Sequence, residues 1–176
     1  KIIIFRIVKK ECEVNEFQRG SASVTVDVDV SADDFWKLLR DWPAVMAWTQ
    51  PENTSSPIID VTLKEGHDVN TLPCTRIIHL DNSKGGAATF EETLLHAYPA
   101  SKRIYYTCAN NPDGINNYMA TTFIDELNDG RARVTCESMF DFPANNSVEG
   151  TIRWLETVYE HSIIRGIEGT IKNKDR

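Results

Sequence analysis

The sequence lacks the features of several protein classes. No long run of basic residues occurs, and 26 Asp and Glu against 19 Lys and Arg give a formal net charge of -7. This charge disfavours nucleic acid and anionic membrane surfaces as partners. The N-terminal apolar run, residues 2–8, is too short to cross a bilayer and contains Arg6. The following Lys9–Glu13 is not a small-residue cleavage site, so a secretory signal is disfavoured and we expect a cytoplasmic protein without a transmembrane segment.

Metal-ligand and nucleophile patterns are also missing. The cysteines are far apart, with no CxxC and no nearby histidine pair, so we expect reduced thiols and no metal site. The histidines are scattered, and no Ser/His/Asp or Cys/His spacing indicates a catalytic nucleophile. Lys84–Gly86 lacks the spacing of a phosphate-binding loop. We expect no metal and no cofactor; the four cysteines are Cys12, Cys74, Cys108 and Cys136.

The composition is that of a globular protein. Hydrophobic residues make up 41% and charged residues 26% of the 176 residues, which is enough chain for one domain that buries about 70% of its unfolded surface. No linker or repeat divides the chain. We divide it into an N-terminal extension, residues 1–19, which is either an added strand or a partner-contacting arm, and a domain over residues 20–176.

Strand patterns occupy most of the domain. Valine alternates with polar residues over residues 23–30, and Ser31–Asp34 is a helix-capping sequence. A short helix is predicted through residues 35–39, ending near Pro43, with a further helical turn or two over residues 44–48. Six more strands are expected between turn signals, at residues 58–64, 74–81, 89–97, 103–109, 117–127 and 131–142.

The last segment is an amphipathic helix. Asn146-Ser147 offers an N-cap, and apolar or small residues then recur three or four apart to about Lys174. Such a helix of about 25 residues is about 38 Å long. Ser162 and Gly166 interrupt its apolar stripe, either to leave room beneath the helix or to let it pack closely. The stripe consists of Val148, Ile152, Leu155, Val158, Tyr159, Ser162, Ile163, Gly166, Ile167 and Thr170.

The element order predicts an α+β helix-grip fold, in which a seven-stranded antiparallel curved sheet surrounds the long C-terminal helix and two short helices follow the first strand. A curved sheet of seven strands has more concave surface than one helix covers. We therefore expect a cavity between the sheet and the C-terminal helix.

Short motifs in this order resemble those of the helix-grip (SRPBCC) superfamily, which includes START lipid-transfer domains, the birch-pollen allergen family and bacterial polyketide cyclase/dehydrase-like proteins. The resemblance covers about residues 20–172 and is strongest to the polyketide cyclase/dehydrase-like proteins and to the branch that holds the plant abscisic-acid receptors. The motifs that carry it are Phe35–Pro43 with Trp48, Cys74–Arg76, Glu92–Leu94, Lys102–Tyr106, Asn117-Tyr118, Glu137-Ser138 and Phe142-Pro143.

The resemblance implies a ligand pocket. We expect Arg76, Phe90 and Tyr159 to share it, because Arg76 and Phe90 lie on apolar faces of their strands and Tyr159 lies in the helix stripe. The residues that the resemblance itself implies are Glu92, Tyr106, Cys108, Tyr118, Ala120 and Glu137, closed by Leu155, Val158 and Ser162.

The sequence departs from the abscisic-acid receptors in three places. Near Thr49-Gln50 it has no lysine of the kind that these receptors use for the ligand carboxylate. The loop Ser83–Ala87 lacks their proline-bearing gate, and Asp113–Ile115 replaces their His-Arg latch. Abscisic-acid sensing is therefore not supported, and a bacterial binder of another small ligand is the better fit.

Four polar residues allow alternatives. Glu92 either anchors a ligand, or acts as an acid or base, or pairs with Arg76 on the adjacent strand. Tyr106 and Tyr118 either pack or orient a ligand through their hydroxyls. Strand alternation places Glu137 opposite the apolar face, whereas the resemblance places it inward, and a bulge near Met139 would reconcile the two.

Three functions remain open. The first is a carrier or sensor for a small hydrophobic or amphipathic molecule that is lipid-, polyketide- or isoprenoid-like. The second is an aromatic polyketide cyclase/dehydrase-type enzyme that uses acid and base groups in the pocket. The third is an interaction module that docks a partner through residues 1–19, and the sequence also leaves a homodimer open.

Overall fold

A computed structural model describes residues 17–48, 58–81, 89–110, 114–143 and 147–174 of the chain. The strands are β1 (Phe17–Val28), β2 (Ile58–Leu63), β3 (Cys74–Leu80), β4 (Thr89–Tyr98), β5 (Arg103–Ala109), β6 (Asn116–Glu126) and β7 (Ala132–Pro143). The helices are α1 (Ala32–Arg40), η1 (Ala44–Ala47), η3 (Pro99–Ser101), α2 (Val148–Thr157), η4 (Val158–Ile164) and α3 (Arg165–Lys174).

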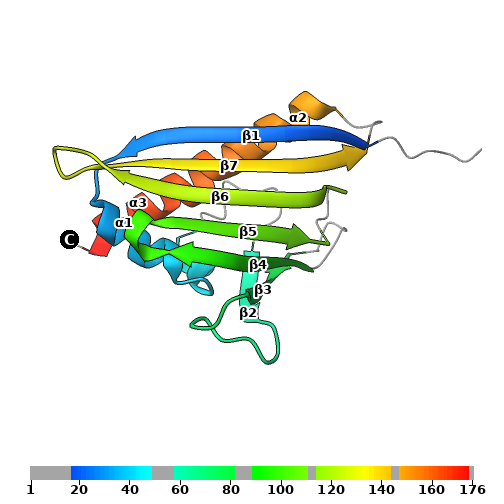
Figure 1. The fold of residues 1–176 in the computed structure, drawn as a ribbon, viewed down its shortest axis with the longest axis horizontal. Helices are drawn as coiled ribbons and strands as arrows, with labels where there is room; N and C mark the ends of the chain where they lie inside the picture. The colour runs from blue at the N-terminus through cyan, green and yellow to red at the C-terminus, as the bar shows by residue number, and fades with distance from the viewer. Residues whose placement is uncertain (1–16, 49–57, 82–88, 111–113, 144–146, 175–176) are drawn as a thin grey trace, which may run out of the picture.

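The strands form one antiparallel sheet in the order β1-β7-β6-β5-β4-β3-β2. Figure 1 shows the C-terminal helix, from α2 to α3, crossing one face of this sheet, with α1 near its far end. The first strand lies beside the last strand and the start of the C-terminal helix, because β1 pairs with β7 and contacts α2. The predicted α+β helix-grip fold is confirmed.

Strand β1 is longer than the sequence pattern predicts. It begins at Phe17, where Phe17 pairs with Pro143, and not at Ser23, where the alternation of valine begins. Long-range pairing with β7 decides this boundary, since the intervening residues carry no apolar alternation of their own. Residues 17–19 are thus part of the sheet, whereas residues 1–16 lie outside the described residues.

Helix α1 forms as its capping sequence predicts. The Ser31 hydroxyl accepts a hydrogen bond from the backbone N–H of Asp34 at 3.1 Å, which satisfies one of the free donors at the helix start. Phe35 and Leu39 are buried on the inner side of the helix, and Trp42 is buried just after its end. Trp42 therefore reaches the core directly from the turn that Pro43 imposes.

The C-terminal helix is continuous but not uniform. Ser147 caps its start, as predicted, and its middle segment η4 is a π-helix of seven residues. This wider turn changes which residues face the sheet, so Ile164 and Glu168 are buried although the regular helical period does not place them in the apolar stripe. Tyr159 and Ser162 both lie in η4 and both are buried.

Gly166 lets the helix approach the rest of the molecule. A Cβ atom built at this position would lie 2.0 Å from the backbone oxygen of Trp48, which is far too close for any side chain. A Cβ built at Gly169 would meet nothing within 4 Å. Close packing is therefore the reason for glycine at position 166.

Within the described ranges, no helix is long and apolar enough to span a membrane.

Candidate functional site

A chain of buried hydroxyl groups connects the sheet to the π-helical segment. The hydroxyl oxygens of Tyr118 on β6 and Tyr159 on η4 are 2.6 Å apart, and the Tyr159 hydroxyl donates to Ser138 Oγ on β7, also at 2.6 Å. All three side chains are at least 94% buried, with exposed fractions of 6%, 2% and 4%. The π-helical turn presents Tyr159 to two adjacent strands at once.

The direction of these hydrogen bonds is determined by the number of protons. A tyrosine hydroxyl has a single proton to donate, and that of Tyr159 goes to Ser138. Tyr118 must therefore donate to Tyr159, and its oxygen keeps acceptor capacity toward its other neighbours.

These hydroxyls are held in their neutral form. Burial raises the pKa of Tyr106 and of Tyr118 well above the usual tyrosine value, and the nearby negative charge of Glu92 raises both further. Burial also raises the pKa of Tyr159, although its hydrogen bond with Ser138 acts in the opposite direction. All three tyrosines thus stay protonated at neutral pH and can serve as hydrogen-bond donors or weak acids, not as bases.

Several buried polar atoms have no hydrogen-bond partner in the described structure. Ser162 Oγ lies on η4, in a side chain only 2% exposed, and makes no hydrogen bond. The indole N–H groups of Trp42 and Trp48 are also buried without an acceptor. Such groups are rare in protein interiors, because each one costs about 1–3 kcal/mol relative to its hydrated state.

Arg76 and Glu92 form an ion pair inside the sheet. They face each other on β3 and β4, and Arg76 Nε donates to Glu92 Oε2 at 2.8 Å. Arg76 Nη1 also donates to the backbone oxygen of Trp42 at 2.6 Å, and its guanidinium lies 3.6 Å from the centre of the Trp42 ring. The pairing that the sequence allowed as one alternative is therefore present, and the two charges offset each other.

Aromatic rings link this ion pair to the hydroxyl chain. The ring centres of Trp42 and Tyr106 are 5.5 Å apart, those of Tyr106 and Tyr118 are 6.1 Å apart, and those of Tyr118 and Phe140 are 6.4 Å apart. The rings form one continuous strip that is apolar on its faces and carries hydroxyls along its edge.

The strand register explains why the predicted residues come together. Arg76, Glu92, Cys108 and Tyr118 are successive cross-strand neighbours, and so are Leu94, Tyr106, Ala120 and Ser138 in the next row. Both rows lie on the face that packs toward the core. Phe90 and Cys108 are partly buried against that core, Leu155 is buried, and Val158 is only partly buried.

Glu137 is the exception. It is exposed, and it lies on the face of β7 opposite to its neighbours Cys136 and Ser138. The inward placement that the resemblance implied is wrong, because the pairing of β1 with β7 runs without a break from Phe17 to Val28 and contains no bulge near Met139. The only irregularity nearby is on β6, between Asn116 and Met119.

Ser138 is the inward residue that the sequence reasoning did not assign to the pocket. Its alternation with Cys136 and Phe140 was a usable signal, since those two residues were expected on the apolar face. The resemblance drew attention to Glu137 instead.

The three loop positions compared with the abscisic-acid receptors fall wholly or partly outside the described residues, as does Cys12.

The cysteines of this region are not activated. Burial raises the pKa of the Cys136 thiol to about 12, and burial also raises the pKa of the Cys74 thiol. A thiolate is needed for nucleophilic attack or metal binding, so neither side chain is suited to these roles. In the described part of the chain, no group of His, Cys, Asp and Glu side chains could hold a metal ion.

Known structures share this fold. The Zhui aromatase/cyclase from Streptomyces sp. R1128 aligns with a TM-score of 0.67 and 16% identity, covering 90% of this chain and 97% of that chain. Truncated norcoclaurine synthase from Thalictrum flavum aligns with a TM-score of 0.66 and 11% identity, covering 89% and 95%. The protein XoxI from Bacillus cereus aligns with a TM-score of 0.66 and 18% identity, covering 89% and 99%.

Sequence comparison identifies the family. No curated protein sequence matches the chain. The family model described as polyketide cyclase/dehydrase and lipid transport matches residues 19–165, a range that runs from β1 to the start of α3 and includes every residue of the hydroxyl chain. The chain therefore belongs to the polyketide cyclase/dehydrase and lipid transport family.

Proposed function

We propose that this protein binds a small, uncharged, amphipathic molecule between the inner face of the sheet and the C-terminal helix, as a carrier or sensor. The ligand is lipid-, polyketide- or isoprenoid-like and carries oxygen atoms that accept hydrogen bonds. The unpartnered hydroxyl of Ser162, buried in the same helical segment η4 as Tyr159 of the hydroxyl chain, is the observation that carries this proposal.

The unpartnered donors support a ligand that bears oxygen. Ser162 Oγ and the indole N–H groups of Trp42 and Trp48 are each buried without an acceptor among the described residues. A purely apolar ligand would leave all three unsatisfied, whereas a carbonyl or hydroxyl oxygen satisfies at least one of them. Alanine or phenylalanine would fill such positions more favourably if nothing polar were bound there.

The charge of the interior supports an uncharged ligand. The Arg76 guanidinium is paired with Glu92 and with the backbone oxygen of Trp42, so it does not leave an uncompensated positive charge for a carboxylate. The buried tyrosines are neutral. A fatty acid anion would therefore lose its hydration without gaining a counter-ion.

Probe uptake tests the proposal. Protein stripped of bound molecules by organic extraction should bind the neutral dye N-phenyl-1-naphthylamine, with a rise in its fluorescence. Ser162→Leu places an apolar side chain under the helix and should abolish uptake, whereas Ser101→Leu, the same change at an exposed site in η3, should not. The ketone 2-decanone should displace the dye, and decanoate should not.

Failure of the extracted protein to bind the dye, together with the absence of any bound molecule before extraction, would overturn the proposal. Uptake that survives Ser162→Leu unchanged would place the dye elsewhere. Displacement by decanoate as effective as displacement by the ketone would contradict the uncharged character of the ligand.

An enzyme of the cyclase/dehydrase type is the second candidate. It is favoured by the series of protonated hydroxyls at Tyr106, Tyr118 and Tyr159. A substrate carbonyl oxygen that gains negative charge competes for these protons, and a hydroxyl donates to it by giving up its hydrogen bond within the chain. For an enzyme, Tyr118→Phe should reduce turnover of a poly-β-ketone about 100-fold while weakening binding only a few-fold. For a carrier, the poly-β-ketone is not turned over, and Tyr118→Phe changes only its binding.

A further inference from the structure

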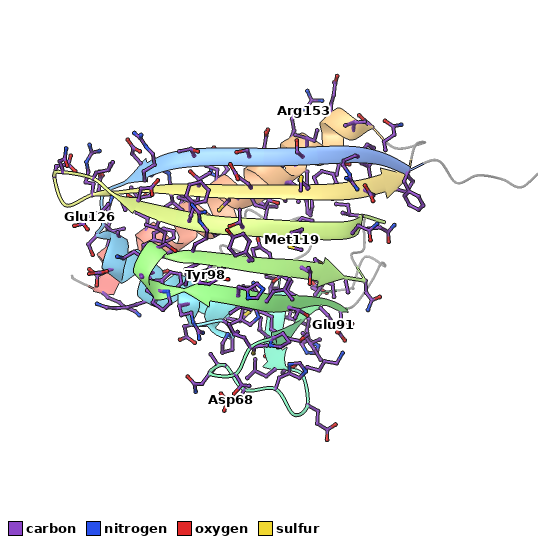
Figure 2. All side chains as sticks on the ribbon, viewed as in Figure 1. Asp68, Glu91, Tyr98, Met119, Glu126 and Arg153 are labelled. Atoms are coloured by element: carbon purple, nitrogen blue, oxygen red, sulfur yellow. The ribbon has the colours of Figure 1, made fainter. Side chains whose placement is uncertain are left out.

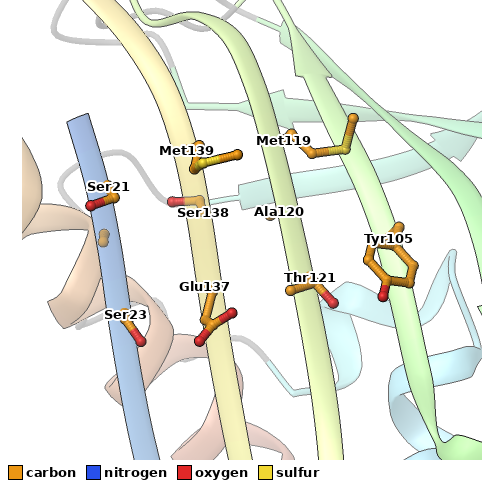
Figure 3. A pocket seen from close by; sticks show the side chains of 10 residues that line it. Ser21, Ser23, Tyr105, Met119, Ala120, Thr121, Glu137, Ser138 and Met139 are labelled. Carbon is orange, nitrogen blue, oxygen red and sulfur yellow. The ribbon is translucent and has the colours of Figure 1, made fainter. Parts of the chain in front are cut away.

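The outer face of the sheet, opposite the C-terminal helix, carries a depression of about 400 Å³. Figure 2 shows Met119 on this face of the molecule, and Figure 3 shows the depression at close range. It extends over β1, β7, β6 and β5, and its lining also includes Ala22, Ala120 and Ser138, whose side chains face the inner side of the sheet. Its outward-facing side chains are those of Ser21, Ser23, Tyr105, Met119, Thr121, Glu137 and Met139.

The strand register arranges these residues as two adjacent rows. Met139 lies between Ser21 on β1 and Met119 on β6, which gives an apolar row with both methionines exposed, at 58% and 41%. Glu137 lies between Ser23 and Thr121 in the next row, which gives a polar row. Tyr105 on β5 lies next to Thr121 and adds an aromatic ring to the polar row.

Glu137 differs from two other carboxylates on this face. Asp141 pairs across the strands with Arg19 at 3.1 Å, and Asp27 pairs with Arg133 at 2.7 Å. Glu137 has hydroxyl side chains at the corresponding cross-strand positions and no ion pair within the described part of the chain. The row on the other side of Glu137, away from the methionines, holds Arg103. Its guanidinium lies over the Phe123 ring, 4.6 Å from the ring centre.

We propose that this depression binds an organic ammonium ion with an apolar body. The Glu137 carboxylate meets the positive charge, and Tyr105 offers a ring face that attracts cations. Met119 and Met139 contact the apolar body through flexible, polarisable thioether chains. The net charge of -7 favours the approach of cations over that of anions.

The size of the site favours a small molecule over a protein partner. A volume of about 400 Å³ falls within the range of about 300–1,000 Å³ that is usual for small-ligand pockets. A stable protein interface buries about 800 Å² on each partner, much of it apolar at the centre, and this face offers only two exposed methionines and a tyrosine there.

Methyl NMR of methionine tests the proposal, because the chain has three methionines and two of them line the depression. Adding hexyltrimethylammonium to protein with ¹³C-labelled methionine methyl groups should shift the signals of Met119 and Met139. The signal of Met46 in η1, which is exposed and does not line the depression, should not move. Hexanoate, which has the opposite charge, should leave all three signals in place.

Variants distinguish a site from general contact with the surface. Glu137→Gln should weaken binding of the ammonium ion about threefold, as expected for an exposed charge pair, and Glu137→Lys should abolish it. Glu126→Gln removes another exposed carboxylate, at the end of β6, and should leave binding unchanged.

Three results would overturn the proposal. The first is equal shifts with hexanoate and hexyltrimethylammonium, and the second is ammonium binding unaffected by Glu137→Lys. The third is a shift of Met119 and Met139 with protein concentration alone, which would assign this face to a second copy of the chain. None of these results bears on dye uptake at the inner site, so the two proposals fail independently.

Discussion

Tyr159 is the residue on which the inner site depends most. Its hydroxyl accepts from Tyr118 and donates to Ser138, so one side chain joins η4 to both β6 and β7. The hydroxyl lies in a region where water is excluded, which makes each lost partner costly.

Tyr159→Phe should lower the free energy of unfolding by about 1–3 kcal/mol, because two buried hydroxyl groups lose their partner. Urea denaturation followed by circular dichroism would measure the change. Tyr98→Phe removes the same atom from a side chain that is 49% exposed, and we expect a change within about 0.5 kcal/mol. Equal effects of the two substitutions would contradict a structural role for the hydroxyl chain.

Glu168 is the buried carboxylate that fixes the end of the C-terminal helix. Its oxygens accept from the backbone N–H of Asp29 at 2.9 Å, from Lys172 at 2.8 Å and from Arg165 at 2.6 Å. Burial raises the pKa of this carboxyl, but the hydrogen bonds from Lys172, the Asp29 backbone and Arg165 outweigh burial, so the pKa lies below its ordinary value of 4.5.

Because the folded-state pKa of Glu168 is depressed, its contribution to stability is present above about pH 4.5 and is lost as the pH falls through the lower, folded-state pKa. Glu168→Gln should lower the free energy of unfolding at pH 7 by about 1–3 kcal/mol and should reduce the loss of stability on acidification. Urea titrations at pH 7, 5 and 3.5 would measure both effects. A variant that loses stability with acid as steeply as the parent would contradict this assignment.

At the scale of elements, the C-terminal helix combines two opposite features, a widened turn and a close backbone contact. Its π-helical segment widens the turn that carries Tyr159 and Ser162, and Gly166, directly after that segment, brings the backbone against Trp48. The helix thus packs closely against the Trp48 backbone at Gly166, and in the turn before that contact it presents the hydroxyls of Tyr159 and Ser162 to the interior.

Gly166→Ala should destabilise the protein by more than about 2 kcal/mol, since the added methyl group would lie 2.0 Å from the Trp48 backbone oxygen and the helix would have to move. Gly169→Ala is the matched control in the same helix. It meets no atom within 4 Å and should stabilise the protein by up to about 1 kcal/mol through helix propensity. Thermal and urea unfolding of both variants would show effects of opposite sign. Stabilisation by both substitutions would rule out the close contact.

Local patterns in the sequence were sufficient to predict the elements. Alternation and turn residues give all the strands, and Ser31 and Ser147 give the two helix starts, because these signals act over a few residues. The π-helical segment was not predictable, since the same residues fit a regular helical stripe until the sheet selects which of them face inward.

The inner site was only partly predictable for the same reason. The pairing of Arg76 with Glu92 follows from two inward positions on neighbouring strands. The contact of Tyr159 with Tyr118 and Ser138 joins residues 41 and 21 positions apart and needs both the register of the sheet and the π-helical turn. For Glu137, strand alternation and the resemblance predicted opposite orientations, and the structure follows the alternation.

At the scale of the whole molecule, the sheet separates two chemically different faces. Its inner face carries a compensated ion pair, neutral tyrosines and unpartnered donors beneath the C-terminal helix. Its outer face carries ion pairs and, beside two methionines, the Glu137 carboxylate, which forms no ion pair with the described residues. The chain belongs to a family described by both polyketide cyclase/dehydrase and lipid transport, which supports ligand binding or cyclase activity without deciding between them.

Native mass spectrometry of the freshly purified protein, before any extraction, tests this account most directly. We predict a species heavier than the chain by the mass of one neutral, oxygen-containing small molecule, and we predict that Ser162→Leu protein carries none. The account would be contradicted if the parent protein were detected only at the mass of the bare chain and still took up no neutral dye. It would also be contradicted by a retained molecule present equally in the Ser162→Leu variant.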